Sequence, residues 1–331
     1  MLIILTPIIS LAQDKYSLTN FLFKEACDLL DNVTEDDSDR KPIDLYKQWN
    51  RPPEDQSPFG SCHAFCAVGL VEAAYYRKFK ERLNFSEKWV LSQIYTTAHF
   101  PGAINPLMPL VAVELDRATD LEGILASGEG FYALVNLEII KKIGVCEESA
   151  YPYWSEESAQ DNEVIDEILD YKYKYSQLLK IFGKERLRAD NVSKAHLKNL
   201  QALYDDLFFI PPEPYNKCQK QAADIAEKIN TITIEAHECS RENCHCLGLI
   251  NEYLRRDIPV AVSIKNYPWT DGKNTGYEHC IIIDGFEPDP KNPDHFMDFY
   301  KTRGSYGPGK DYPIGRFKLD DITEIYAVEL K

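Results

Sequence analysis

The amino-acid sequence predicts an α+β protein, with helices in the first part of the chain and strands near its end. The segment that follows Cys62 is apolar on nearly every side and becomes charged only from Arg77, as in a helix buried in a core. Residues 130–143 have the pattern of a second helix, which Gly144 ends as a C′ glycine. Later, short apolar runs alternate with turns rich in Gly, Pro and Asp, which predicts strands at 258–264, 279–286, 298–304 and 315–319.

Residues 155–230, approximately, are predicted to form a helical insertion between these two parts. Apolar residues recur there at helical spacing with charges between them, and a second helical stretch ends before the pair Pro211-Pro212. The simplest interpretation is a solvated elaboration of one lobe. The alternative is a structure that overhangs a binding cleft, limits the length of a substrate or docks a partner.

Composition and charge narrow the classes of function. A formal charge of −16 argues against a nucleic-acid partner, because binding a phosphate backbone needs a basic surface. Residues 1–12 are apolar but too short to span a bilayer as a helix. The small residues of Ser10-Leu11-Ala12 predict a signal peptide over 1–12, with a buried N-terminal strand as the alternative. A polar lead-in is expected over 13–41, and no membrane contact once the signal is removed.

The nine cysteines are typical of a protein of an oxidising compartment. Because nine is odd, at least one thiol stays unpaired if every disulfide is intramolecular. Residues 237–246 (HECSRENCHC) place Cys and His at close spacing, but a structural zinc site needs two well-separated pairs of ligands. Disulfides are therefore expected there, and neither a metal nor another cofactor. The expected location is outside the cytoplasm: secreted, periplasmic or in a lysosome-like compartment.

The segment DQSPFGSCHAF, residues 55–65, raises the question of what Cys62 does. A cysteine nucleophile needs a lowered pKa, a general base within hydrogen-bonding reach and donors for an oxyanion. Cys62 lies where the first buried helix should begin, and the free N–H groups and the dipole of a helix start favour a thiolate. Gln56 precedes it on the loop, where its side-chain amide could donate to an oxyanion beside the backbone N–H of Cys62.

The same segment resembles the active-site segment of the papain family of cysteine proteases, whose pattern is roughly Q-G-x-C-G-S-C-W-A-F. The match keeps six residues: Gln56, Gly60, Ser61, Cys62, Ala64 and Phe65. Four further segments resemble family motifs in the family's order: 84–91 (NFSEKWVL), 133–153 (ALVNLEIIKKIGVCEESAYPY), 258–264 (IPVAVSI) and 277–286 (YEHCIIIDGF). The resemblance covers about 42–154 and 250–331. It implies one papain-like peptidase domain over 42–331, with a helical lobe, an antiparallel β-barrel-like lobe and an active-site cleft between them.

The resemblance also implies roles for individual residues. Cys62 would be the nucleophile, and His279 its general base and later the general acid. Gln56 and the backbone N–H of Cys62 would hold the oxyanion. Four more residues would contact or border the substrate: Gly60, Ser61, Gly128 and Tyr306. A disulfide-bonded or inert Cys62 and an ordinary core histidine at position 279 are the alternatives.

Three departures from the family pattern affect the site. Gly304, in RGSYG (303–307), stands where K-N-S-W-G places the asparagine that orients the histidine, and Thr302 is the nearest polar substitute. His63 stands in place of the tryptophan after the nucleophile. Phe59 stands in place of a cysteine, so one common family disulfide cannot form. The loss of an orienting residue should lower the rate rather than abolish it, because triad effects are not additive.

The predicted function is hydrolysis of peptide bonds through a thioester at Cys62. Two alternatives remain open: a catalytically impaired pseudo-protease that binds or regulates, and a Cys-His acyl transferase or amidase that acts on non-protein amides. The expected partner is a polypeptide substrate, and a protein inhibitor is a second, open one. The chain is expected to act as a monomer.

Overall fold

The computed structural model describes most of the chain on either side of the predicted insertion and part of the insertion itself. Helices come first in the chain and most of the antiparallel sheet follows, so the α+β prediction is confirmed. The described residues are 42–45, 48, 55–56, 59–99, 133–154, 165–168, 170, 173–174, 177, 198–199, 202–203, 212–239, 245–265, 279–287, 299–303, 313–314 and 322–331.

Helix α3 (Cys62–Phe79) is the central element of the helical lobe. Every residue from 63 to 75 is buried, which confirms the buried helix that the all-round apolar pattern predicts. Arg77 and Lys78 lie in the last turn, where basic side chains meet the negative end of the helix dipole. The helix ends at Lys80, whose φ of 59° turns the chain out of the helical conformation.

Helices α4 (Glu87–His99) and α7 (Ala133–Ile143) pack beside α3. Helix α7 ends at Gly144, which has a φ of +76°, as the sequence predicts. A Cβ atom at this position would lie 1.7 Å from the carbonyl oxygen of Ala222. Glycine is therefore required here both for the left-handed conformation and for the close approach of another backbone segment.

The sheet has seven strands, and every pair of neighbours is antiparallel. Its order is β2-β7-β3-β4-β5-β6, with β1 paired to β4 outside this path. The strands are β1 (Ile43–Asp44), β2 (Ile232–Glu238), β3 (Val260–Ile264), β4 (His279–Glu287), β5 (Phe299–Arg303), β6 (Pro313–Ile314) and β7 (Ile322–Leu330). Strands β3, β4 and β5 confirm the first three strand predictions, and the fourth, at 315–319, lies outside the described residues.

The elements not predicted from the sequence include strands β2 and β7 and helix α12 (His245–Arg255). Strand β2 reads ITIEAHE and strand β7 reads ITEIYAVEL, so charged residues interrupt the apolar pattern of both. Helix α12 begins inside the Cys- and His-rich segment 237–246, where the sequence predicts disulfides and no helix. Strands β7 and β2 extend the sheet beyond β3, on the side away from β4.

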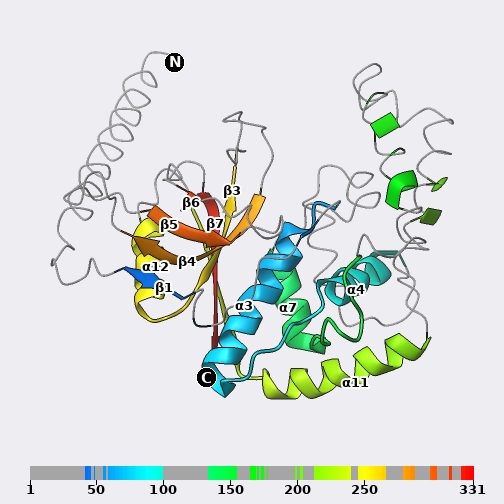
Figure 1. Cartoon of the computed structure of the whole chain (residues 1–331), viewed down its shortest axis with the longest axis horizontal. Helices are drawn as coiled ribbons and strands as arrows, with labels where there is room; N and C mark the ends of the chain where they lie inside the picture. The colour runs from blue at the N-terminus through cyan, green and yellow to red at the C-terminus, as the bar shows by residue number, and fades with distance from the viewer. Residues whose placement is uncertain are drawn as a thin grey trace, which may run out of the picture.

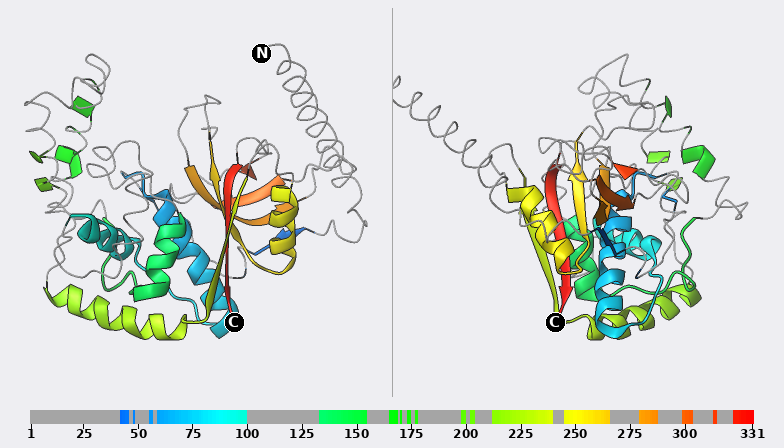
Figure 2. Two further views of the ribbon diagram at one scale, coloured as in Figure 1. Left: turned by 180° about the vertical axis from the view of Figure 1, so that it is seen from behind. Right: turned by 60° about the vertical axis from the view of Figure 1, so that its left-hand side comes forward.

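Helix α3 lies where the helical lobe meets the sheet (Figure 1). It contacts β3, β4 and β7 on one side and α4 and α7 on the other. Figure 2 shows the sheet between α3 and α12, so the strands are covered by a helix on each face. One apolar cluster runs through this arrangement and includes residues from α3, α7, β3, β4 and β7. The start of α3 and the start of β4 are thus fixed against each other by the core of the protein.

The end of the predicted insertion is part of the core. Helix α11 (Pro212–Lys228) packs on α7, and a disulfide joins Cys146 to Cys218. Lys228 donates a hydrogen bond to the hydroxyl of Tyr75, which lies about 20 Å along α3 from Cys62 at 1.5 Å per residue. This helix therefore lies at the far end of α3 from Cys62, as Figure 1 shows. The two interpretations of the insertion remain open for its other residues.

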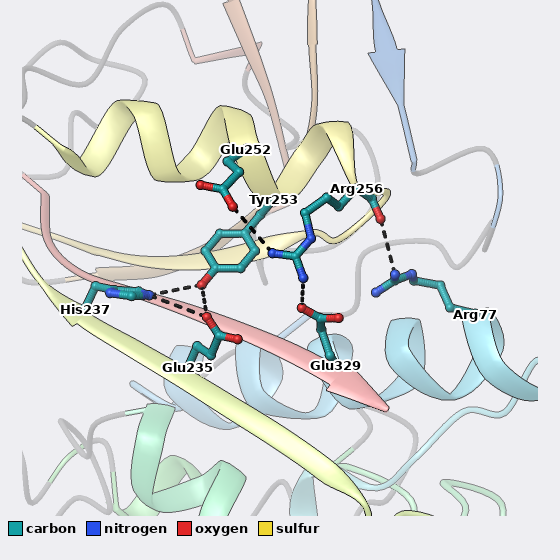
Figure 3. A network of polar contacts seen from close by, with 7 residues as sticks. All are labelled: Arg77, Glu235, His237, Glu252, Tyr253, Arg256 and Glu329. Carbon is teal, nitrogen blue, oxygen red and sulfur yellow. Dashed lines mark hydrogen bonds and ion pairs between the residues drawn. The ribbon is translucent and has the colours of Figure 1, made fainter. Parts of the chain in front are cut away.

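A network of polar side chains joins α12, β2, β7 and the end of α3 (Figure 3). The guanidinium of Arg256 contacts the carboxylates of Glu252 and Glu329, and Arg77 donates to the backbone carbonyl of Arg256. The hydroxyl of Tyr253 donates to Glu235 and contacts the imidazole of His237. We call these seven residues the polar network.

Among the helices that the structure describes, none combines the length and the apolar character that crossing a bilayer requires.

Candidate active site

The structure brings Cys62 next to the strand that carries His279. The backbone N–H of Cys280 donates a hydrogen bond to the Cys62 sulfur at 3.4 Å, although the two residues lie 218 positions apart in the chain. Cys62 is the first residue of α3, and His279 is the first residue of β4. Two residues that the sequence predicts to act together are therefore held at adjacent ends of two core elements.

Burial determines the protonation states of the Cys62 thiol and the His279 imidazole. Loss of solvent raises the pKa of the Cys62 thiol to about 12, and this effect outweighs the backbone N–H groups that favour the thiolate. Burial likewise lowers the pKa of His279 to about 4. The expectation that the start of α3 lowers the pKa of Cys62 is thus wrong for this arrangement. At neutral pH the pair consists of a thiol and a neutral imidazole.

The loop before Cys62 is closed by hydrogen bonds that involve Gln56. The side-chain amide nitrogen of Gln56 donates to the carbonyl of Phe59 at 2.8 Å, and the backbone N–H of Phe59 donates to the carbonyl of Gln56 at 3.1 Å. Gln56 is buried, with 3% of its surface exposed, so the position of its side chain is fixed.

Tyr153 ties both ends of this loop together. Its hydroxyl donates to the carbonyl of Gln56 at 2.8 Å and contacts the hydroxyl of Ser61 at 2.8 Å. Burial raises the pKa of the phenol well above its usual value, so the hydroxyl keeps the proton that it donates. The ring packs edge-on against Phe65 and Trp154. Tyr153 was not predicted to belong to the site, although it ends the Y-P-Y motif at 151–153.

Ser61 and Phe59 have structural roles in the same loop. Ser61 occupies the N-cap position of α3 and is buried, but its side chain makes no capping bond and instead contacts Tyr153. The ring of Phe59 lies edge-on to Trp154 with centroids 5.0 Å apart. A buried aromatic contact thus occupies the position where the family pattern has a disulfide cysteine.

His63, the residue after the nucleophile, is buried and pairs with Asn136 of α7. The Asn136 side-chain nitrogen lies 2.9 Å from Nδ1 of His63. An amide nitrogen can only donate, so Nδ1 accepts and the imidazole carries its proton on Nε2. Two buried polar side chains therefore replace the apolar contact that a tryptophan would make, and they join α7 to the first turn of α3.

Four of the predicted site residues are not placed by their side chains. Gly128, Gly304 and Tyr306 lie outside the described residues. Thr302 is placed by its backbone only: its Cα pairs with Ile283, four residues along β4 from His279. The structure thus fixes Cys62, His279, Gln56, Gly60 and Ser61, and leaves the orienting partner of the histidine as a prediction.

The described cysteines are of two kinds, disulfide-bonded and free. Disulfides join Cys146 to Cys218 and Cys239 to Cys246, and the second bond confirms the disulfide prediction for residues 237–246. Cys62, Cys66 and Cys280 hold reduced thiols. Among the described His, Cys, Asp and Glu residues, no group of three or more gathers as a metal site.

The fold and the site together define a protein in which helices pack on an antiparallel sheet, and the cysteine that begins α3 contacts the backbone of the residue after the histidine that begins β4. No family model and no curated protein sequence matches the chain. One similar solved structure is a digestive procathepsin L 3 of the larval midgut of Tenebrio molitor, with 13% identity and a TM-score of 0.46. That similarity covers 87% of this chain and 69% of the other.

A second similar structure comes from a study of antibody cross-reactivity between the mite allergens Blo t 1 and Der p 1. It has 14% identity and a TM-score of 0.47, and the similarity covers 87% of this chain and 70% of the other. At these identities and scores, neither likeness decides the chemistry of this chain. The function is therefore argued from its own residues.

Proposed function

We propose that this protein is a papain-like cysteine peptidase that hydrolyses peptide bonds through a thioester at Cys62. The observation that carries the proposal is the 3.4 Å contact from the Cys280 N–H to the Cys62 sulfur, because it brings the nucleophile to the start of the strand that begins with His279. Five sequence segments in the family's order support the same assignment.

The neutral state of both groups favours general-base catalysis over a preformed ion pair. The imidazole of His279 accepts the thiol proton as the Cys62 sulfur attacks the carbonyl carbon of the substrate. The amine then leaves with a proton from His279, and a thioester remains. In the second half of the reaction, His279 activates a water molecule, which releases the carboxylic acid and restores the thiol.

The oxyanion of each tetrahedral intermediate lies beside Gln56 in this proposal. The side-chain amide of Gln56 and the backbone N–H of Cys62 are its donors. Gly304 has no side chain to orient His279, so the orientation of the imidazole relies on the packing around β4. Thr302 is the candidate to replace the orienting asparagine of the family. Gly60, Ser61, Gly128 and Tyr306 border the bound peptide. The proposed setting is secreted, periplasmic or lysosome-like, and the chain acts as a monomer.

The raised pKa of Cys62 also favours a second candidate, a pseudo-protease that binds peptides without turning them over. Burial stabilises the thiol strongly, and the family's histidine-orienting asparagine is missing. A binding protein would keep the architecture and lose only the chemistry. The two candidates differ in one measurable quantity, the release of new amino termini.

The test is digestion of a denatured protein mixture with the full chain, followed by mass spectrometry of the peptides. The proposed function predicts cleavage that is lost in Cys62→Ala and kept in Cys239→Ser, which removes a remote cysteine. Added glycinamide separates a peptidase from an acyl transferase, because a transferase would yield amide-capped products. Peptide binding with no cleavage by the wild-type chain would replace the peptidase with the pseudo-protease.

A further inference from the structure

Two reduced cysteines next to the nucleophile have no role in the proposed reaction. Cys66 lies on α3 and is 3% exposed, and Cys280 lies on β4 and is 5% exposed. The histidine segment of the papain family, N-H-A-V, has alanine where this chain has Cys280. Other cysteines of the chain form disulfides, and the expected location is oxidising, so thiols that stay reduced here need an explanation.

The three sulfur atoms form a chain of neighbours. Cys62 and Cys66 are four residues apart on α3, which places their Cβ atoms about 5–6 Å apart on one face. Cys280 contacts both residues, because its N–H donates to the Cys62 sulfur and its thiol is hydrogen-bonded to the Cys66 thiol. Cys280 is therefore within reach of the other two thiols.

The three thiols differ in their exposure. Cys66 and Cys280 are buried, and a thiol in apolar surroundings reacts slowly by itself. Cys62 is only half-buried, so an oxidant from solvent meets it first; its raised pKa makes this reaction slow at neutral pH and faster at alkaline pH. An oxidised Cys62 would then lie beside two reduced thiols that can attack it.

We propose that Cys66 and Cys280 form an oxidation site, a dithiol that a peroxide converts to a disulfide between α3 and β4, with Cys62 as the thiol at which the peroxide enters. The proposal concerns the thiols alone and does not depend on peptide hydrolysis.

The reaction balances in three steps. The Cys62 sulfur attacks hydrogen peroxide, the O–O bond breaks, and Cys62 becomes a sulfenic acid while one water leaves. The Cys280 sulfur then attacks the Cys62 sulfur, which forms a disulfide and releases the second water. Finally the Cys66 sulfur attacks Cys280, and Cys62 leaves as a thiol with the proton from Cys66. Two thiols are oxidised in total, and one peroxide is reduced to two waters.

Two consequences follow from this sequence. Cys62 returns to the thiol state, so it escapes the irreversible step to sulfinic acid. The new bond also joins the helical lobe to the sheet directly beneath the nucleophile. Reduction with a dithiol reagent restores the starting state.

The experiment treats the full chain, with its two disulfides intact and Cys62, Cys66 and Cys280 as thiols, with hydrogen peroxide at mildly alkaline pH. The chain is then denatured and alkylated with iodoacetamide, and its cysteines are mapped by mass spectrometry. The expected result is a Cys66–Cys280 disulfide, an alkylated Cys62 and unchanged Cys146–Cys218 and Cys239–Cys246 bonds. The proposal would be overturned if, after peroxide treatment, Cys66 and Cys280 were both alkylated and Cys62 were found as sulfinic acid.

Two variants test the order of the steps. Cys66→Ser should stop the sequence at a Cys62–Cys280 disulfide, so that Cys62 is no longer alkylated. Cys280→Ala should expose Cys62 to further oxidation and increase its sulfinic acid several-fold. Equal sulfinic acid in the wild type and Cys280→Ala would contradict the relay, and circular dichroism of each variant checks that it is folded.

Discussion

The two ends of helix α3 have opposite electrostatic environments. At its start, Cys62 contacts the residue after His279, and loss of solvent favours the neutral form of both side chains. At its end, Arg77 meets the polar network, whose charged side chains remain partly exposed (Figure 3). The contrast shows that loss of solvent, rather than the helix dipole, determines the charge of the nucleophile. The polar network therefore provides matched control residues for the active site.

The largest expected effect follows the removal of the general base. His279→Gln should lower kcat/KM for peptide hydrolysis by about 10³- to 10⁴-fold, because the thiol then has no acceptor for its proton. The matched control is His237→Gln in the polar network, which should leave the rate unchanged. Equal losses in the two variants would show that His279 has no special role.

The next effect concerns acid stability. The folded-state pKa of His279 is about 4 and its unfolded value about 6.5, so the unfolded state binds more protons between these pH values. The free energy of unfolding is therefore unaffected by His279 above pH 6.5. It decreases by about 3 kcal/mol as the pH falls from 6.5 to 4, because only the unfolded state then binds the proton.

Urea unfolding of the wild type and of His279→Gln at several pH values measures this contribution. The difference between the two curves isolates His279 from the carboxyl groups, which titrate in both proteins. The His237→Gln variant should follow the wild type. A difference that does not change between pH 7 and 4 would mean that His279 is solvated rather than buried.

A smaller effect is expected from Tyr153, which holds the loop before Cys62 through Gln56 and Ser61. Tyr153→Phe should lower kcat about 10-fold, because Gln56 loses the bond that fixes its carbonyl. Alkylation of Cys62 by iodoacetamide should be unchanged, since displacement at a saturated carbon forms no oxyanion.

The control for this prediction is Tyr253→Phe, which removes a hydroxyl from the polar network. Both its turnover and its alkylation rate should equal those of the wild type. If Tyr153→Phe slowed alkylation as much as turnover, the tyrosine would be supporting the fold of α3 rather than the position of Gln56.

The smallest effect is expected within the polar network. Glu329→Gln should change the free energy of unfolding by less than about 1 kcal/mol, because exposed ion pairs contribute little and are screened by salt. Chemical denaturation at low and high salt measures it. A loss well above this value at both salt concentrations would show that the network is as important to stability as the buried end of α3.

The sequence predicted the buried elements of the fold better than the half-exposed ones. The all-round apolar pattern of α3 and the continuous apolar runs of β3 and β4 identify elements that are covered on both sides. Strand β7 was missed because Glu324 and Glu329 interrupt its pattern. Glu324 contacts Ser263 of β3, and Glu329 contacts Arg256, which follows α12, so these partners lie far away in the sequence. No local pattern reveals such partners.

The candidate site was predicted in its identities but not in its electrostatics. The motifs name Cys62, His279 and Gln56, and the structure places the Cys62 sulfur against the backbone N–H of Cys280, the residue after His279. The lowered thiol pKa was wrong because burial is a property of the packed structure and not of a helix start. Tyr153 could have been found from its place in the Y-P-Y motif, but its contacts to Gln56 and Ser61 exist only in three dimensions.

One measurement tests the central claim that Cys62 and His279 form a catalytic pair. The full chain is incubated with an epoxysuccinyl peptide, which reacts with the thiols of cysteine proteases, and its intact mass is determined beside Cys62→Ala and His279→Gln. A catalytic pair predicts a single adduct on the wild type, none on Cys62→Ala and a much slower reaction on His279→Gln. No adduct on a wild-type chain whose Cys62 is shown to be reduced would contradict it.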